Sequence, residues 1–311
     1  MKTSDPAKPK LVVIVGPTAV GKTELSIQLA RHFHGEIISA DSRLFYRGMD
    51  IGTAKPSLAE MAGIPHHLID VADPDQTWSL SLFQQQATQI ALEITARGKL
   101  PFLVGGTGQY IRAVADGWTP PEVTPNPRLR DELEVIANQR GSEWLYDRLA
   151  SIDPAAAANI DHRNVRRTIR ALEVIFTTGH LFSTQRATST SPFETLFIGL
   201  IRPRQQLYAR VDARIEKMFA DGLLAEVAAL LAKGFSPDLP SMSAIGYREA
   251  VAVLQGKMTQ AEAIIEMKRI TRVFVRRQAN WFKPDDPRIH WFEMQTQDTT
   301  PLFTLITEFL T

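Results

Sequence analysis

The sequence predicts an α/β fold, with a parallel sheet as its core and a helical domain inserted between two parts of that core. Three observations predict this fold class. Short apolar runs alternate with helical stretches over the first third of the chain, which is the pattern of βαβ units. A phosphate-binding motif follows the first apolar run, and a proline-rich segment further along opens a stretch of helices. The length of 311 residues is enough for roughly two domains.

The strands expected in the core are short and apolar, as in sheets that are covered on both faces. They are Leu11–Val15, Glu36–Ser39, His67–Val71 as a weaker candidate, Pro101–Gly105, Thr195–Ile201 and Ile289–Glu293. The first helix is expected at Thr23–Phe33, where Leu25 and Leu29 recur at helical spacing. Further core helices are expected at Ser79–Arg97 and from Gln109 onward.

A proline-rich segment, TPPEVTPNP at residues 119–127, interrupts this alternation. It holds four prolines in nine residues, which excludes a regular helix and predicts a linker or hinge. Only helical segments are expected after it, and ATSTSP at residues 187–192 closes the stretch. These segments lie near Pro127–Arg140, Glu143–Leu149, Pro154–Asn159 and Asn164–Thr177. We therefore expect a discontinuous core of residues 1–117 and 192–311, and a helical insertion domain of residues 118–191.

The composition excludes several classes of protein. There is no cysteine, which excludes disulfides, thiolate nucleophiles and Fe–S clusters. No apolar stretch approaches the roughly 18 residues of a membrane helix, and the opening MKTSDPAKPK lacks the apolar core of a secretion signal. The expected location is the cytoplasm, without contact to a membrane. Thirty-five Lys and Arg against 34 Asp and Glu give a net charge of +1, which by itself predicts no partner.

The clearest motif is GPTAVGKT, Gly16 to Thr23, which fits the phosphate-loop pattern between a buried strand and a helix. Its glycines let backbone N–H groups turn toward phosphate oxygens, and the helix N-terminus adds partial positive charge. Lys22 supplies a full charge and Thr23 a hydroxyl for Mg²⁺. The motif therefore predicts a P-loop NTPase-like core that binds a di- or triphosphate with Mg²⁺. The motif leaves the reaction open, because three carboxylates beyond strands could serve as base or metal partner. They are Asp41, Asp70 and Asp73.

Two further loops follow strands of the predicted sheet, at the edge where ligands bind in open α/β folds. Ile38–Pro56 is long and polar, and its Asp41 is expected to face Lys22. Asp41 is either a catalytic group or the cap of a helix that starts at Ser42. GGTGQY, Gly105–Tyr110, brings Thr107 to the same edge, where it is either a site residue or a helix N-cap.

Four segments, in this order and at this spacing, resemble the tRNA dimethylallyltransferase family. They are GPTAVGKT, SADSRLFYRGMDIGTAKP, PHHLIDVADP and LVGGTGQY. RALEV, AIGYRE and TRVFVRRQANWF also match, so the resemblance spans nearly the whole chain. The phosphate loop is generic, whereas the ADSR…YRGMDIGTAKP block is specific to this family. The eukaryotic branch adds a C-terminal zinc finger, so we expect this Cys-free chain to be of the bacterial form.

The resemblance implies transfer of a dimethylallyl group from dimethylallyl diphosphate to N6 of adenosine 37 in a tRNA anticodon stem-loop, with release of diphosphate. It implies that Asp41, Thr107 and Lys22 are catalytic, with Asp41 as general base, and that Thr23 holds Mg²⁺. The implied diphosphate-binding residues are Gly16, Pro17, Thr18, Ala19, Val20, Gly21, Lys22 and Thr23. The implied tRNA-binding residues are Asp41, Ser42, Arg43, Leu44, Thr107, Arg130, Arg166, Arg167, Thr168, Ile169, Arg170, Thr271, Arg272, Arg276, Arg277 and Gln278.

Two basic segments, Asp161–Arg170 and Glu266–Arg277, suit such a partner, although basic runs are more often solvated helix faces. A helix at Glu262–Trp281 would carry a stripe of Lys268, Arg272 and Arg276. Its opposite, apolar face would comprise Met267, Ile270, Phe274 and Trp281.

The flipped acceptor base could stack on Phe45 or Tyr46, although the more common role of such loop aromatics is packing on the core. The seven histidines lack metal-ligand spacing and are read as structural or surface residues.

Three other functions remain open from the sequence. A P-loop kinase of a small molecule would use Asp41 to activate a hydroxyl, but it would not need two Arg-rich segments. Prenylation of free AMP, ADP or ATP would likewise need no extended RNA surface. An RNA-binding module gated by a nucleotide would need neither Asp41 nor Thr107. We expect a monomer with tRNA and dimethylallyl diphosphate as its partners.

Overall fold

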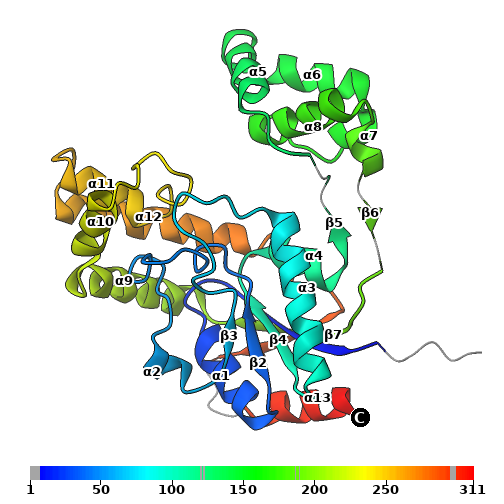
Figure 1. Cartoon of the computed structure of the whole chain (residues 1–311), viewed down its shortest axis with the longest axis vertical. Coiled ribbons are helices and arrows are strands. Elements are labelled where there is room, and N and C mark those ends of the chain that lie inside the picture. Colours follow the sequence, from blue (N-terminus) through cyan, green and yellow to red (C-terminus); the bar gives the residue numbers. More distant parts are fainter. Residues whose placement is uncertain (1–7, 120, 122, 186, 189, 295–298) are drawn as a thin grey trace, which may run out of the picture. The chain divides into compact units, whose positions relative to one another are not determined.

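The computed structural model describes residues 8–119, 121, 123–185, 187–188, 190–294 and 299–311 (Figure 1). The opening seven residues, from which we argued against a secretion signal, lie outside the described residues, as do Pro120 and Glu122 of the proline-rich segment. The chain forms two compact units. One comprises Met1–Ala115 with Ser191–Thr311, and the other is Asp116–Thr190.

The first unit is built on a parallel sheet with the strand order β3-β2-β4-β1-β7-β8. The strands are β1 (Lys10–Val15), β2 (Glu36–Ser39), β3 (His66–His67), β4 (Pro101–Gly105), β7 (Glu194–Ile201) and β8 (Ile289–Glu293). Every neighbouring pair is parallel. The central strand β1 is buried from Leu11 to Val15, as expected for an apolar strand between two helical layers. The predicted α/β fold class is confirmed.

One predicted strand is mostly wrong. The third strand was expected at His67–Val71, but β3 covers only His66–His67. Leu68 and Asp70 have φ angles of 60° and 56°, in the left-handed region that breaks an extended strand. The chain there pairs instead with the loop after β2, since the Asp70 N–H donates to the Leu44 carbonyl at 3.1 Å.

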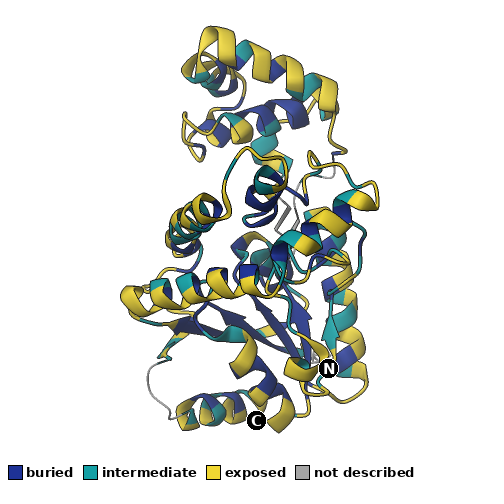
Figure 2. Cartoon of the chain, turned by 90° about the vertical axis from the view of Figure 1, so that its left-hand side faces the viewer, coloured by how far each residue is buried: buried dark blue, intermediate teal, exposed yellow. Residues whose placement is uncertain are grey.

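Helices cover both faces of the sheet, and Figure 2 shows buried strands beneath helices that expose their outer sides. The helices of this unit are α1 (Lys22–His32), α2 (Leu58–Met61), α3 (Leu80–Ala96), α4 (Gly108–Ala115), α9 (Arg204–Ala220), α10 (Leu223–Ala232), α11 (Tyr247–Leu254), α12 (Gln260–Gln278) and α13 (Thr300–Leu310). Because strand residues alternate between faces, Val12 and Ile14 pack with α1 and α9 while Leu11 and Val13 pack with α3. Within the part of the chain that the structure describes, no helix is both long and apolar enough to cross a membrane.

The second unit is mainly helical. Its helices are α5 (Pro127–Arg140), α6 (Ser142–Ile152), α7 (Pro154–Ala157) and α8 (Val165–Thr178), with a 3-10 turn at Phe182–Gln185. Asn126, Asp153 and Asn164 cap α5, α7 and α8 with their side chains. The expectation of helices alone is corrected in one detail, because β5 (Trp118–Thr119) and β6 (Ala187–Thr188) form an antiparallel pair where the segment begins and ends.

Candidate active site

The phosphate loop connects β1 to α1 and encloses the ammonium group of Lys22. Lys22 Nζ donates to the carbonyls of Gly16 and Pro17, both at 2.9 Å. A Cβ at Gly16 would lie 2.7 Å from the Leu200 carbonyl, and its φ of 152° disfavours other residues. Burial lowers the pKa of Lys22 to about 8, with a further lowering by Arg214 and an opposing effect of Asp41. The lysine is thus largely protonated at neutral pH and poised for an anion.

Asp41 lies in the loop after β2, and its charge acts on the phosphate-loop lysine. Residues 42–45 form a turn, so a helix capped by Asp41 at Ser42, one of the two alternatives, is wrong. Asp41 Oδ1 instead accepts the Arg43 N–H at 3.0 Å, which fixes the start of this turn. The other candidate carboxylates are engaged in ion pairs, Asp70 with Lys55 and Asp73 with Arg47. Of the three, Asp41 is the one whose charge is felt at Lys22.

Thr107 lies between β4 and α4, where its carbonyl accepts the N–H groups of Tyr110 and Ile111. Because β4 is hydrogen-bonded to both β1 and β2, the loops that carry Lys22, Thr107 and Asp41 leave the same edge of the sheet. The structure therefore brings the three predicted catalytic residues to one edge. Thr23 is exposed in the first turn of α1.

Gln278 was expected to contact tRNA, and the structure instead buries it against the phosphate loop. Its side-chain oxygen accepts the backbone N–H of Thr18 at 2.9 Å and the Thr18 hydroxyl at 3.1 Å. Its amide nitrogen donates to the Gly106 carbonyl at 3.4 Å. At 8% exposure, Gln278 joins two loops of the site and leaves little surface for RNA.

Two arginines of α9, which sequence reasoning missed, also approach the phosphate loop. Arg210 Nε donates to the Ala19 carbonyl at 2.8 Å. Burial lowers the pKa of Arg214, as does the neighbouring Arg210, while Asp41 opposes this shift. With Lys22, they form a cationic group beside the phosphate loop that suits a multiply charged anion. The available signal was their i, i+4 spacing beside the buried Val211, which places both on one side of the helix.

The aromatic side chains near Asp41 form a packed cluster. Phe45 is fully buried, with ring centroids 5.4 Å from Trp78 and 5.8 Å from Phe83 and Tyr110. The hypothesis that Phe45 stacks on a flipped base is therefore wrong, and the core-packing alternative is correct. Burial raises the pKa of Tyr110 to about 12, with smaller effects of Tyr46, Arg43 and Asp41.

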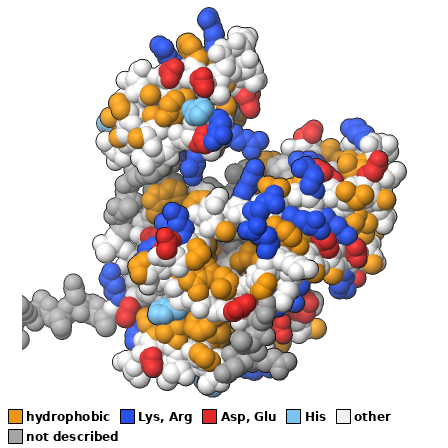
Figure 3. Space-filling model, turned by 180° about the vertical axis from the view of Figure 1, so that it is seen from behind, with side chains coloured by type: hydrophobic (Ala, Val, Ile, Leu, Met, Phe, Trp, Pro, Cys, Tyr) orange, Lys and Arg blue, Asp and Glu red, His pale blue; other side chains and the backbone are white. Residues whose placement is uncertain are grey.

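The basic stripe predicted on α12 is partly neutralised by α9. Lys268 Nζ lies 2.6 Å from Glu216, and Arg272 forms an ion pair with Asp212. Figure 3 shows the Lys and Arg side chains of this region, and a shallow groove runs along the same face of α12. Arg276 and Arg277 are exposed and form no ion pair with any described residue.

The predicted apolar face of α12 is also partly wrong. Phe274 is 43% exposed, whereas the helix buries Ala263, Met267, Val275 and Gln278. The helix ends at Gln278, three residues before the expected Trp281.

The predicted RNA contacts of the second unit divide into exposed and internal residues. Arg166 and Arg167 are exposed at the start of α8. Thr168 and Ile169 are buried at 1% and 6% exposure. Arg130 and Arg170 both bind the fully buried Glu173, at 2.8 and 2.6 Å. Burial alone would raise the pKa of Glu173, but these two arginines hold it below its ordinary value. Of this set, only Arg166 and Arg167 are exposed arginines whose guanidinium groups have no partner among the described residues.

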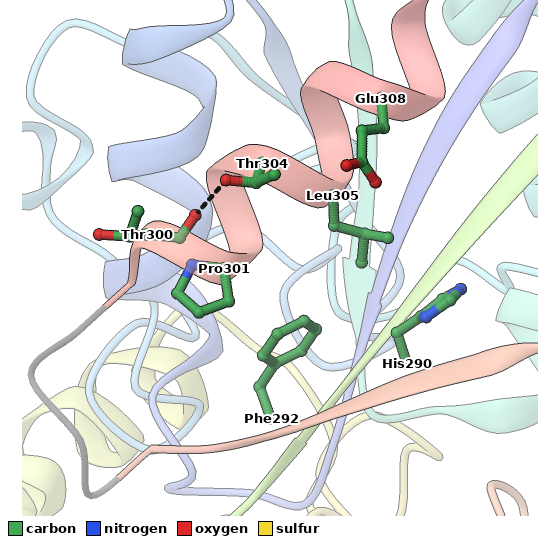
Figure 4. Close-up of a pocket in the computed structure, with 7 residues that line it drawn as sticks. All are labelled: His290, Phe292, Thr300, Pro301, Thr304, Leu305 and Glu308. Carbon is green, nitrogen blue, oxygen red and sulfur yellow. Dashed lines mark hydrogen bonds between the residues drawn. The ribbon is translucent and has the colours of Figure 1, made fainter.

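A separate pocket lies between β8 and α13 and contains none of the predicted site residues (Figure 4). Its lining residues are His290, Phe292, Thr300, Pro301, Thr304, Leu305 and Glu308. Among the described residues, no group of three or more His, Asp or Glu is placed to hold a metal ion.

A phosphate loop flanked by cations and faced by a carboxylate defines an enzyme that handles a phosphorylated substrate on a P-loop NTPase-like sheet. Comparison with known proteins identifies the family. The model of the IPP transferase family matches residues 44–285, and that of the isopentenyl transferases matches residues 9–72. The chain belongs to the IPP transferase family, which confirms the resemblance seen in the sequence motifs.

Named relatives and solved structures agree with this assignment. A tRNA dimethylallyltransferase of Roseiflexus sp. (strain RS-1) is 56% identical over 88% of this chain and 90% of the relative. One of Thermomicrobium roseum is 47% identical over 91% of this chain and 86% of the relative. The full-length tRNA isopentenylpyrophosphate transferase of Bacillus halodurans is 44% identical, with a TM-score of 0.71 over 97% of this chain and 96% of that one. A eukaryotic dimethylallyltransferase captured acting on tRNA is 29% identical, with a TM-score of 0.81 over 97% of this chain and 79% of that one.

Proposed function

We propose that this chain transfers a dimethylallyl group from dimethylallyl diphosphate to N6 of adenosine 37 in the anticodon loop of tRNA, releasing diphosphate. The observation that carries the proposal is the convergence of Lys22, Arg210 and Arg214 on the phosphate loop, with Asp41 facing them, in a chain of this family. Because tRNA is the proposed acceptor, we also propose the cytoplasm as the location.

On the donor side, an allylic C–O bond breaks and its electron pair leaves with the diphosphate. Lys22, which now bonds the loop's own carbonyls at 2.9 Å, would turn toward the phosphate oxygens. Fixed cations in a site shielded from water stabilise such a leaving group without reorganisation. The exposed hydroxyl of Thr23 fits a hydrated Mg²⁺ at the mouth of the loop, and the ion would offset part of the diphosphate charge.

On the acceptor side, the exocyclic amine of adenine is a poor nucleophile, because its lone pair is delocalised into the ring. A carboxylate hydrogen-bonded to N6–H increases its nucleophilicity and accepts the proton as the new C–N bond forms, which typically contributes about 10²–10⁴-fold. The Arg43 N–H bonds Oδ1 of Asp41, and Oδ2, which has no hydrogen-bond partner among the described residues, would accept the proton. Thr107, at the same sheet edge, is proposed to contact the reacting centre.

On the RNA side, the free cations are the proposed phosphate contacts. These are Arg276 and Arg277 on α12, and Arg166 and Arg167 on α8. Arg130, Arg170, Lys268 and Arg272 already form ion pairs with carboxylates of the same chain, and we assign them to structure. Arg43 and its neighbours in the loop after β2 are proposed to surround the target adenosine.

The test is incubation of the protein with unmodified tRNA and radiolabelled dimethylallyl diphosphate, without ATP. Label in tRNA, mapped to adenosine 37 by nuclease digestion, is the expected result. Label in free AMP, or a requirement for ATP with phosphorylation of a small molecule, would contradict the proposal and support one of the alternatives. A tRNA with guanosine at position 37 serves as the control acceptor and should remain unlabelled.

A further inference from the structure

The carboxylate of Glu226, in the first turn of α10, binds three consecutive backbone amides of the loop after β2. Its Oε2 accepts the N–H groups of Asp50 at 2.9 Å and Ile51 at 2.7 Å, and its Oε1 accepts that of Gly52 at 3.2 Å. Three amides aimed at one anion form a strong, directional site, because each bond is charge-assisted. Here a side chain of the same protein fills it.

Tyr247, the first residue of α11, completes this arrangement. Its hydroxyl donates to Glu226 Oε1 at 2.5 Å, and the side chain is fully buried. Burial raises the pKa of Tyr247, and the charge of Glu226 raises it further, so the hydroxyl stays a donor. A Cβ on Gly52 would lie 2.4 Å from the Tyr247 ring, so only glycine lets the loop pack this closely. The AIGYRE motif, to which the proposed chemistry gives no role, thereby meets the YRGMDIGTAKP motif.

The beginning of the same loop, which carries Asp41, is attached to the segment just before Tyr247. Arg43 Nη1 donates to the Pro240 carbonyl at 3.4 Å. Near the end of the loop, Lys55 Nζ donates to the Tyr46 carbonyl at 2.8 Å and pairs with Asp50, which links the end of the loop to its middle. The loop is therefore attached to the α10–α11 region at two points, Arg43 and Asp50–Gly52. Asp41 lies two residues before the first of these points, and its charge acts on Lys22 of the phosphate loop.

We propose that Glu226 and Tyr247 are positioning residues, which hold Asp50–Gly52 and so fix the loop that aims Asp41 at the acceptor amine. The inference rests on the proposed function, since it assigns these residues to the transfer step. Among the described residues, the side chains of Glu226 and Tyr247 hydrogen-bond to Asp50–Gly52 and to each other and not to the phosphate loop. Their effect should therefore fall on turnover and leave diphosphate binding unchanged.

Glu226→Gln is the test, because all four partners of the carboxylate are hydrogen-bond donors. A carboxamide of the same shape presents its NH₂ to at least one of them, so the arrangement is broken without a change of volume. We expect kcat to fall at least tenfold, while the KM for dimethylallyl diphosphate and the affinity for inorganic diphosphate stay within twofold of wild type. Hydrogen exchange at the amides of Asp50 to Gly52 should become faster. Glu308→Gln, an exposed substitution on α13, is the matched control and should match wild type in every measurement.

A loss of melting temperature with unchanged kcat per folded molecule would overturn the inference, because Glu226 would then be structural only. A rise in the KM for dimethylallyl diphosphate as large as the fall in kcat would also overturn the inference. If Glu226→Gln does not reach the wild-type fold by circular dichroism, Tyr247→Phe decides, since it removes one hydroxyl and keeps the ring. We expect at least a threefold loss of kcat for that variant, and an unchanged kcat would contradict us.

The labelling assay with wild-type protein tests the proposed function separately. If wild-type protein leaves tRNA unlabelled, the proposed transfer reaction is contradicted. The hydrogen exchange of Asp50 to Gly52 still reports whether Glu226 holds the loop.

Discussion

The division of α12 into paired and free cations predicts which arginines bind tRNA. We expect the double variant Arg276→Ala/Arg277→Ala to weaken tRNA binding strongly. The double variant Lys268→Ala/Arg272→Ala should leave the salt-dependent part of the tRNA affinity nearly unchanged. The reason is that Lys268 and Arg272 already bond Glu216 and Asp212 of α9, whereas Arg276 and Arg277 are exposed. Each phosphate contact on single-stranded RNA contributes about 0.7 to the slope of log affinity against log salt. The first double variant should therefore reduce this slope by about 1.4, and the second by about 0.

The assay is tRNA binding by fluorescence anisotropy between 50 and 300 mM KCl, with a melting curve for each variant as the control for folding. Lys268→Ala/Arg272→Ala should lower stability modestly, because partly exposed ion pairs contribute about 0–1 kcal/mol each. Equal slope changes for the two double variants would refute the reasoning. The paired residues would then exchange their carboxylate partners for phosphates, and all of the stripe would be RNA surface.

The features that the sequence predicted well are those fixed by local patterns. The strand at Leu11–Val15 is a continuous apolar run, and burial between two layers is what such a run requires. The phosphate loop needs its glycines and lysine at fixed spacing, so Lys22 was found directly. Asp41 and Thr107 followed from one rule, that loops at the carboxyl ends of parallel strands share an edge.

The features that the sequence missed depend on which helix packs beside which. Arg210 and Arg214 read as an ordinary solvated helix face until α9 is seen beside the phosphate loop. The helical spacing correctly predicted that the basic residues of α12 share one face. It could not predict the acidic partners of Lys268 and Arg272, which lie more than fifty residues away along the chain. Sequence spacing shows that charges share a face and cannot show what faces them.

Gln278 shows the same limit for a polar residue. The helical pattern of apolar residues predicts that a glutamine such as Gln278 faces solvent, and the family resemblance implied that it contacts RNA. The side chain is buried because Thr18 and Gly106 satisfy its amide, and buried polar groups are tolerated only when they are bonded in this way. Phe274 shows the converse: the helical pattern placed it on the buried, apolar face, but its side chain is exposed.

Three further predictions test single residues. Lys22→Ala should abolish turnover and leave tRNA affinity nearly intact, and an equal loss of both would contradict its assignment to the diphosphate. Asp41→Asn keeps the bond to the Arg43 N–H, so tRNA binding should survive while kcat falls about 10²-fold or more; a wild-type rate would reduce Asp41 to a turn-forming residue. Glu36, at the start of β2, predicts a pH effect on stability. Burial alone would raise its pKa, but bonds from Lys99 and His67 and the charge of Arg97 lower it from 4.5 to about 2. Since the folded pKa lies below the unfolded one, the stabilisation is complete above about pH 4.5 and is lost as the pH falls toward 2. Urea unfolding at pH 5, 4 and 3 should show the free energy of unfolding declining in wild type and declining less in Glu36→Gln. Parallel declines in the two proteins would mean that the acid sensitivity resides in other carboxylates, such as the buried Glu173.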